Sequence, residues 1–260
     1  MGKETEQKQE IVNQGVHTYS QEEAYVWPEE PVLREQLEWF QDQKLALMVH
    51  WGVYNQLGMV ASWALSDEDA EWSRKTVDWT DDGEVFKRQY RALNRAFDPV
   101  AFQPEEWAKM AKKCGFRYLI LTTKHHDGFC LWDTAYTEYK TTAEDCPFHT
   151  HKYADIVRAM FDAFRKEKLG IGVYYSKADW HCPDYWEKEK VFTGKTTRNP
   201  TYDPKENPEA WERFRAFTRD QILELGKQYG RLDILWFDAG WVAATNGQDI
   251  RLGEIVEEVR

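Results

Sequence analysis

An acidic and an aromatic side chain lie two residues apart near the end of the sequence. An apolar run from Leu232 to Phe237 stops at Asp238, and Gly240 follows. If this run is a strand, Trp236 and Asp238 face the same side, because alternate residues of a strand share a face. A carboxylate beneath the anomeric carbon of a sugar can act as a nucleophile. The pair therefore indicates chemistry on a carbohydrate, with a helix N-cap or a buried ion pair as the alternative role of Asp238.

Polar and aromatic side chains also follow three other short apolar runs, at residues 45–50, 118–123 and 169–175. In a barrel of parallel strands the active site lies at the strands' C-terminal ends, so these side chains should converge on one rim. Histidines at such a rim can donate hydrogen bonds to the hydroxyl groups of a polyol and accept them. The candidate rim residues are His50, Trp51, Lys124, His125, His126, Asp127, Tyr174, Tyr175, Ser176, Trp236 and Asp238.

His125 and His126 could also be metal ligands. Adjacent residues of a strand face opposite sides, so both reach one ion only if the chain has already turned. The His149-Thr150-His151 segment has His-x-His spacing, but it lies in a proline-containing loop. We therefore predict no bound catalytic metal. A structural, hydrogen-bonded role for one of His125 and His126 is an open alternative.

Helices and apolar runs alternate along the chain and must position these side chains. Glycines such as Gly115 and Gly230 follow helical patterns, as is typical of helix C-termini. Continuously apolar strands between helices predict a parallel α/β sheet with strands buried on both faces. No glycine-rich phosphate loop follows a strand, which disfavours a dinucleotide-binding sheet. We expect helices at residues 31–44, 104–113, 153–168 and 208–229, and strands at 45–50, 118–123, 169–175 and 232–238.

The predicted fold is a TIM-like (β/α) barrel that is incomplete in this chain. About four βα units are readable, whereas a closed barrel has eight strands. We expect residues 1–30 to form a flexible lead-in and residues 31–260 to form the N-terminal portion of a barrel catalytic domain. Open sheet edges predict self-association or pairing with the remainder of the barrel. The tryptophan-rich insertions at residues 52–97 and 178–205 favour a binding role.

Composition excludes several other classes of protein. The chain has 34 basic and 45 acidic residues, a net charge of −11, which argues against nucleic acid or anionic membranes as partners. No apolar stretch is long enough for a membrane span, and no signal peptide is visible. If the N-terminus is native, the protein is expected to be cytoplasmic. If a leader has been removed, the protein is expected to be periplasmic or secreted. The four cysteines form no CxxC motif and are expected to be free thiols.

Four segments, in order and spacing, strongly resemble the α-L-fucosidases of glycoside hydrolase family 29. The resemblance covers residues 37–245, and its most specific part is the Lys-His-His-Asp-Gly-Phe segment at 124–129. The segments are Trp39-Phe40 with Val49-His50-Trp51-Gly52, Thr122 to Trp132, Gly172-Val173-Tyr174-Tyr175-Ser176, and Leu235-Trp236-Phe237-Asp238.

The resemblance implies a retaining exo-enzyme that removes terminal α-L-fucose from glycans through a covalent fucosyl-enzyme, without a metal or organic cofactor. Asp238 aligns with the nucleophile of the family. Many members carry Glu-Trp after the first strand, where this chain has Ser62-Trp63, so the contacts of this loop with fucose differ. The residues implied to bind fucose are His50, Trp63, His125, His126, Tyr174 and Trp236.

A retaining glycosidase also needs a second carboxyl group as the acid/base. Glu254, Glu257 and Glu258 follow Asp238, but their pattern is that of a solvated helix face. We therefore expect the acid/base beyond Arg260. Two alternatives remain open: a carbohydrate-binding pseudo-enzyme that lacks the acid, and a metal-dependent barrel hydrolase.

Overall fold

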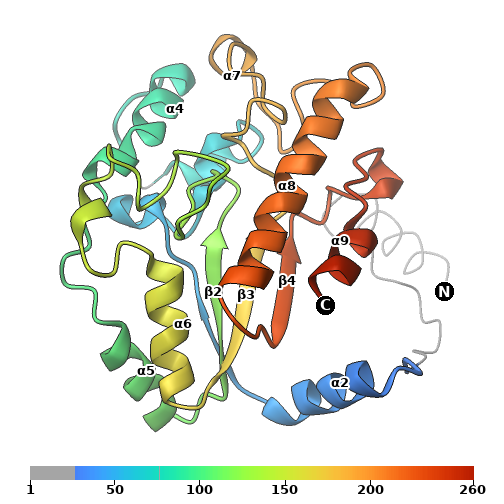
Figure 1. Ribbon diagram of the computed structural model, residues 1–260. Coiled ribbons are helices and arrows are strands. Elements are labelled where there is room, and N and C mark those ends of the chain that lie inside the picture. The colour runs from blue at the N-terminus through green and yellow to red at the C-terminus, as the bar shows by residue number, and fades with distance from the viewer. Residues whose placement is uncertain (1–26, 76) are drawn as a thin grey trace, which may run out of the picture.

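A computed structural model of the protein describes residues 27–75 and 77–260. Its four strands form one sheet in the order β1-β2-β3-β4, and every neighbouring pair is parallel. All four strands therefore end at the same edge of the sheet (Figure 1), and the predicted parallel α/β architecture is confirmed. The strands are β1 (Ala46–Val49), β2 (Tyr118–Lys124), β3 (Gly170–Ser176) and β4 (Ile234–Asp238).

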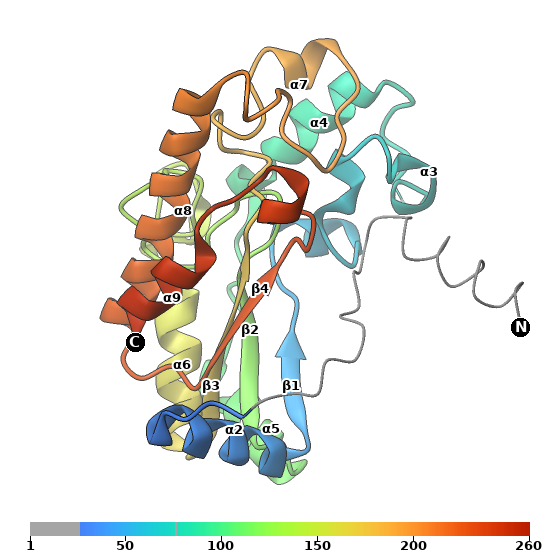
Figure 2. The ribbon, with the colours of Figure 1, turned by 90° about the vertical axis from the view of Figure 1, so that its right-hand side faces the viewer.

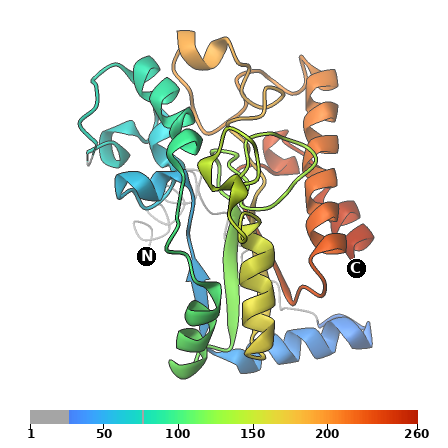
Figure 3. The same cartoon turned by 60° about the vertical axis from the view of Figure 1, so that its left-hand side comes forward.

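Helices cover one face of this sheet, as Figures 1 and 3 show. Helix α6 buries Val157, Phe161 and Phe164 on a stripe against the sheet, and Asp155 caps its N-terminus. Gly115 and Gly230 have positive φ, as expected of residues that end helices. The helices between and around the strands are α2 (Pro31–Gln43), α5 (Pro104–Lys113), α6 (Ile156–Lys166), α8 (Pro208–Gln228) and α9 (Leu252–Val259).

The two faces of the sheet are covered differently. β2 and β3 are buried almost throughout, but Met48 of β1 and Trp236 of β4 are 40% and 48% exposed. The prediction that every strand is buried on both faces is therefore wrong for β1 and β4. The physical reason is that both are edge strands with one partner among the described residues. Figure 2 shows that α6 and α8 lie on the face opposite these two side chains, whereas α2 runs across the lower end of the sheet.

Two long insertions pack together above the C-terminal ends of the strands (Figure 2). Asp67 joins them: it binds Lys87 at 2.6 Å and accepts from the backbone N–H of Thr196 at 2.7 Å. Trp180 and Trp186 are fully buried in the core, so the predicted binding role of the aromatic insertions does not hold for them. The insertions and nearby loops contain α3 (Ala70–Ser73), α4 (Gly83–Arg91), α7 (Lys190–Thr193) and short 3₁₀ turns at Val53–Leu57, Ser62–Leu65, Leu93–Ala96, Pro147–Thr150 and Ala244–Asn246.

Three other expectations can be compared with the structure. The predicted free thiols are confirmed, because none of the four cysteines forms a disulfide. No helix in the described part of the chain has the length and apolarity to cross a membrane. The predicted lead-in at residues 1–30 lies mostly outside the described residues.

Candidate active site

The carboxylate of Asp238 lies at the C-terminal end of β4, with its side chain 36% exposed. Both oxygens accept hydrogen bonds: Oδ2 from the hydroxyl of Tyr174, and Oδ1 from the backbone N–H of Ala239 at 2.7 Å. Ala239 has a φ of 65°, the left-handed region that favours glycine. The turn after β4 thus directs an oriented carboxylate out of the sheet.

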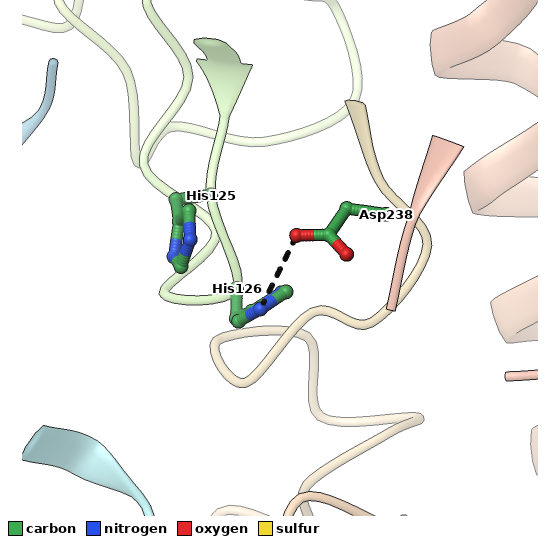
Figure 4. A group of neighbouring side chains, drawn as sticks. All are labelled: His125, His126 and Asp238. Carbon is green, nitrogen blue, oxygen red and sulfur yellow. Dashed lines mark ion pairs between the residues drawn. The ribbon is translucent and has the colours of Figure 1, made fainter. Parts of the chain in front are cut away.

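His125 and His126 lie side by side facing this carboxylate (Figure 4). β2 ends at Lys124, so both histidines follow the strand, and their ring centroids are 4.1 Å apart. His126 Nε2 is 3.8 Å from Asp238 Oδ2. The opposite nitrogens bind serines: His125 Nδ1 lies 2.6 Å from Ser62 Oγ, and His126 Nδ1 lies 2.6 Å from Ser176 Oγ. Each histidine therefore makes a buried hydrogen bond to a serine. The structural role predicted for one of the two histidines is thus shared by both.

His50, Trp63 and Tyr174 complete the cluster. The His50 ring lies 5.0 Å from the Tyr174 ring and 5.5 Å from the His125 ring, and its Nδ1 is 3.0 Å from Thr122 Oγ1. The Trp63 ring lies 4.7 Å from the His126 ring. Six of the seven predicted site residues therefore gather at one place. The seventh, Trp236, pairs with Tyr174 in the β3–β4 register and remains half-exposed.

Burial sets the charge state of the ring residues. It lowers the pKa of His125 and of His126 well below the ordinary value of 6.5. Burial also lowers the pKa of His50, and the negative charge of Asp238 opposes this shift. For Tyr174, burial and the adjacent Asp238 both raise the pKa. Near neutral pH the site therefore holds neutral histidines and a protonated tyrosine that donates to Asp238.

One group of side chains could hold a metal ion. His125, His126 and Asp238 each offer one ligand atom, and these atoms lie within 4.8 Å of one another. Asp238, however, already accepts hydrogen bonds at both oxygens, and each histidine has one nitrogen engaged by a serine. The donor set is thus arranged as a hydrogen-bonding cluster.

Three predicted rim residues point away from this cluster, which corrects the sequence prediction. Lys124 is buried and contacts Asp179 at 2.8 Å, together with Tyr175 and Gln221. Asp127 is also buried and accepts from the hydroxyl of Tyr90 at 2.8 Å. The register of β2 against β3 is irregular between Thr122 and Lys124, so Lys124 lies opposite Tyr175, whose side chain faces the core.

Sequence reasoning missed residues that support the site. Ser176 was only part of the rim, and Ser62 was noted only as a departure from the family pattern. Arg198 lies 4.9 Å above the Trp63 ring and makes an ion pair with Asp69 at 2.6 Å. A single serine or arginine has no local sequence pattern that could have identified these contacts.

Two hollows in the described part of the chain lie away from this cluster. One, of about 350 Å³, lies at the other end of the sheet and includes Trp39, Arg117 and Asp233 in its lining. The other, of about 240 Å³, includes Gly128, His181 and other residues on the helix side. Neither contains Asp238 or His126, so we assign the site from its chemistry rather than from the depth of a hollow.

Comparison with known proteins identifies the family. A model of the alpha-L-fucosidase family matches residues 12–260. The chain belongs to the alpha-L-fucosidase family. It is 27% identical over 203 residues to tissue alpha-L-fucosidase of Rattus norvegicus, which covers 78% of this chain and 39% of that protein.

Two solved structures of alpha-L-fucosidases agree with this assignment. Isoenzyme 1 of Paenibacillus thiaminolyticus superposes with a TM-score of 0.65 at 33% identity, covering 87% of this chain and 48% of that one. A covalent intermediate of the Bacteroides thetaiotaomicron GH29 enzyme, trapped with 2-fluoro-fucosyl fluoride, gives a TM-score of 0.60 at 27% identity and covers 94% of this chain and 49% of that one. The four-stranded sheet is therefore part of the TIM-like barrel of this family, and the chain spans less than half of each of these proteins.

Proposed function

We propose that the protein is a retaining α-L-fucosidase that removes terminal α-L-fucose from glycans, with Asp238 as the nucleophile. The observation that carries this proposal is the oriented Asp238 carboxylate, held by Tyr174 beside two neutral histidines. Membership of the alpha-L-fucosidase family supports the choice of substrate. The covalent intermediate of the Bacteroides thetaiotaomicron relative supports the double displacement.

In this mechanism Asp238 attacks the anomeric carbon as the bond to the leaving oxygen breaks, which forms a fucosyl ester. Water then attacks the same carbon, the ester bond breaks, and fucose leaves with its anomeric configuration retained. His50, His125 and His126 bind the sugar hydroxyls, and Trp63 and Trp236 offer aromatic surface. A second carboxyl, about 5 Å from the nucleophile, protonates the leaving oxygen and then, as a carboxylate, takes a proton from the attacking water; its position beyond Arg260 stays a prediction.

The decisive experiment labels the nucleophile. The protein is incubated with 2-fluoro-fucosyl fluoride, and the modified peptide is identified by mass spectrometry. Fluoride leaves as the bond forms, and we expect a 2-fluoro-fucosyl ester on Asp238 that is absent in Asp238→Asn, while the exposed Asp81→Asn control labels normally. An adduct on another carboxylate would overturn the assignment of Asp238.

Binding and turnover measurements separate the alternative functions. A pseudo-enzyme that lacks the acid would bind fucose, as calorimetry measures, but would turn over no substrate. A metal-dependent hydrolase would lose its activity when a chelator is added. We expect turnover of the aryl fucoside that a chelator does not change.

A further inference from the structure

We propose that Ser62 and Ser176 are positioning residues that fix His125 and His126 in opposite neutral tautomers. His126 then presents a bare acceptor nitrogen to the site, and His125 presents an N–H donor. The tautomers follow from hydrogen bonds within the chain alone. Their use in reading two hydroxyl groups of the substrate rests on the proposed function.

The tautomer of His126 follows from the single proton of the Ser176 hydroxyl. Ser176 Oγ lies 2.6 Å from the carbonyl oxygen of Ala178, which can only accept, so the hydroxyl proton points there. The same oxygen lies 2.6 Å from His126 Nδ1 and must therefore accept from an Nδ1–H group. Neutral imidazole carries one proton, so His126 Nε2 has a free lone pair. This atom is buried and without a hydrogen-bond partner in the described structure.

The tautomer of His125 follows from the same reasoning with the opposite result. Ser62 Oγ accepts from the backbone N–H of Asp127 at 3.2 Å. Its own proton needs an acceptor, and within the described residues the remaining partner is His125 Nδ1 at 2.6 Å. His125 Nδ1 therefore accepts, and its Nε2 carries the proton. Both serines are fully buried, so water does not compete for these hydrogen bonds.

Opposite tautomers give the site two distinct contacts. A hydroxyl facing His126 must donate its proton, whereas a hydroxyl facing His125 can accept one. The assignment also separates this cluster from a metal site, because a protonated His125 Nε2 cannot bind an ion. Ser62, a departure from the family's Glu-Trp pattern, thereby acquires a defined role.

Nitrogen NMR tests the tautomers directly, because protonated and bare imidazole nitrogens have widely separated shifts. The full chain is labelled with ¹⁵N-histidine, and the signals are assigned with His125→Gln and His126→Gln. Near neutral pH we expect His126 protonated at Nδ1 and His125 at Nε2. In Ser176→Ala we expect the His126 proton to move toward Nε2, attracted by Asp238 3.8 Å away. Thr218→Val, which removes a buried hydroxyl without a partner, is the control and should leave both signals unchanged.

Either of two results would overturn the proposal. One is the same tautomer for both histidines in the unaltered protein, and the other is an unchanged His126 tautomer in folded Ser176→Ala. A merely structural serine would affect stability without moving the proton. Because these spectra need no substrate, they test the tautomers independently of the proposed function.

The proposed pairing of the two histidines with substrate hydroxyls is tested with nitrophenyl α-L-fucosides. In these analogues each ring hydroxyl in turn is replaced by fluorine or by hydrogen. Fluorine can accept a hydrogen bond weakly but cannot donate one. It is therefore a better substitute for a hydroxyl that accepts a hydrogen bond than for a hydroxyl that donates one. At one position we expect the fluoro and deoxy analogues to bind equally poorly, about 3- to 10-fold weaker than the parent. At another position fluorine should restore part of the loss. Equal behaviour at all positions would overturn the hydroxyl pairing, and no binding of any fucoside would overturn the proposed function while the spectra still report the tautomers.

Discussion

Tyr174 is the side chain that orients the proposed nucleophile, through the hydrogen bond it donates to Asp238 Oδ2. Tyr174→Phe removes this donor while keeping the ring that packs beside His50. A hydrogen bond to a charged group contributes about 1.5–3 kcal/mol, so we expect kcat/KM on an aryl fucoside to fall roughly 10- to 100-fold. Steady-state kinetics measure this directly.

A neighbouring tyrosine offers the matched control. Tyr54 is also buried near His125, but its hydroxyl has no hydrogen-bond partner in the described structure. Tyr54→Phe should therefore leave kcat/KM nearly unchanged. Equal losses in both variants would mean that Tyr174 acts through packing rather than through its hydroxyl.

Asp127 should make the stability of the protein depend on pH. Burial, only partly offset by the hydrogen bonds from Tyr90 and from the Phe129 backbone, raises the pKa of Asp127 from 3.8 to about 7. Between these values the folded protein holds a proton that the unfolded chain has released. The contribution of Asp127 to stability is therefore full below about pH 4 and is lost as pH rises to about 7, by roughly 4 kcal/mol at most.

Asp127→Asn tests this prediction, because asparagine keeps the shape and cannot ionise. Urea unfolding across this pH range should show the variant gaining stability relative to the unaltered protein as pH rises. The exposed Asp81→Asn serves as the control and should track the unaltered protein. A pH-independent difference between the two proteins would contradict a titrating Asp127.

At the scale of elements, the buried pair Lys124–Asp179 ties the end of β2 to the loop after β3. Burial alone would lower the pKa of Lys124, but the charge of Asp179 raises it above its ordinary value. Asp179 also accepts from the backbone N–H groups of His181 and Cys182 at 2.9 and 2.8 Å. Lys124→Met leaves this carboxylate buried without its cation, so we expect a loss of about 3–5 kcal/mol in the free energy of unfolding, measured with urea.

A second substitution distinguishes charge from packing. Asp179→Asn removes the charge and keeps an oxygen for the backbone groups. The double variant Lys124→Met with Asp179→Asn should therefore be more stable than Lys124→Met alone. If the two losses simply add, the ion pair contributes little and the packing of Lys124 dominates.

The elements that carry the site could be predicted from the sequence because their patterns are local. The helix expected at 104–113 is α5, and the strand expected at 232–238 contains β4 (Ile234–Asp238). Continuous apolar runs and terminal glycines mark such elements without knowledge of distant contacts. Helix α4 within the insertion after β1 escaped prediction; its buried Tyr90 donates to Asp127 in the loop after β2, a contact with a distant segment.

Contacts between distant segments could not be predicted in the same way. The clustering of His50, Tyr174 and Asp238 followed from the rule that parallel strands end at one edge. The hydrogen bond of Ser62 to His125 joins residues 63 positions apart and leaves no periodic signal. The predicted rim position of Lys124 rests on its place beside the histidines, whereas the irregular register of β2 after Thr122 turns Lys124 into the core.

At the scale of the whole molecule, the sheet has one face packed on helices and one face less covered. Met48, Ile120 and Trp236 lie on the latter, on the same side as Tyr174 by strand alternation and register. Met48 and Trp236 are the exposed members of this face, at its two edges. An exposed apolar sheet face with unpaired edges favours association with another chain.

We therefore expect the 260-residue chain to associate with itself through this face, increasingly so at higher concentration. Met48→Glu places a charge on the face without touching the site, so it should shift sedimentation velocity profiles toward the monomer. Val100→Glu is the matched control, because Val100 is 68% exposed in the chain segment between β1 and β2, outside the sheet. A purely monomeric chain at all concentrations, or equal effects of both substitutions, would contradict association through the sheet face.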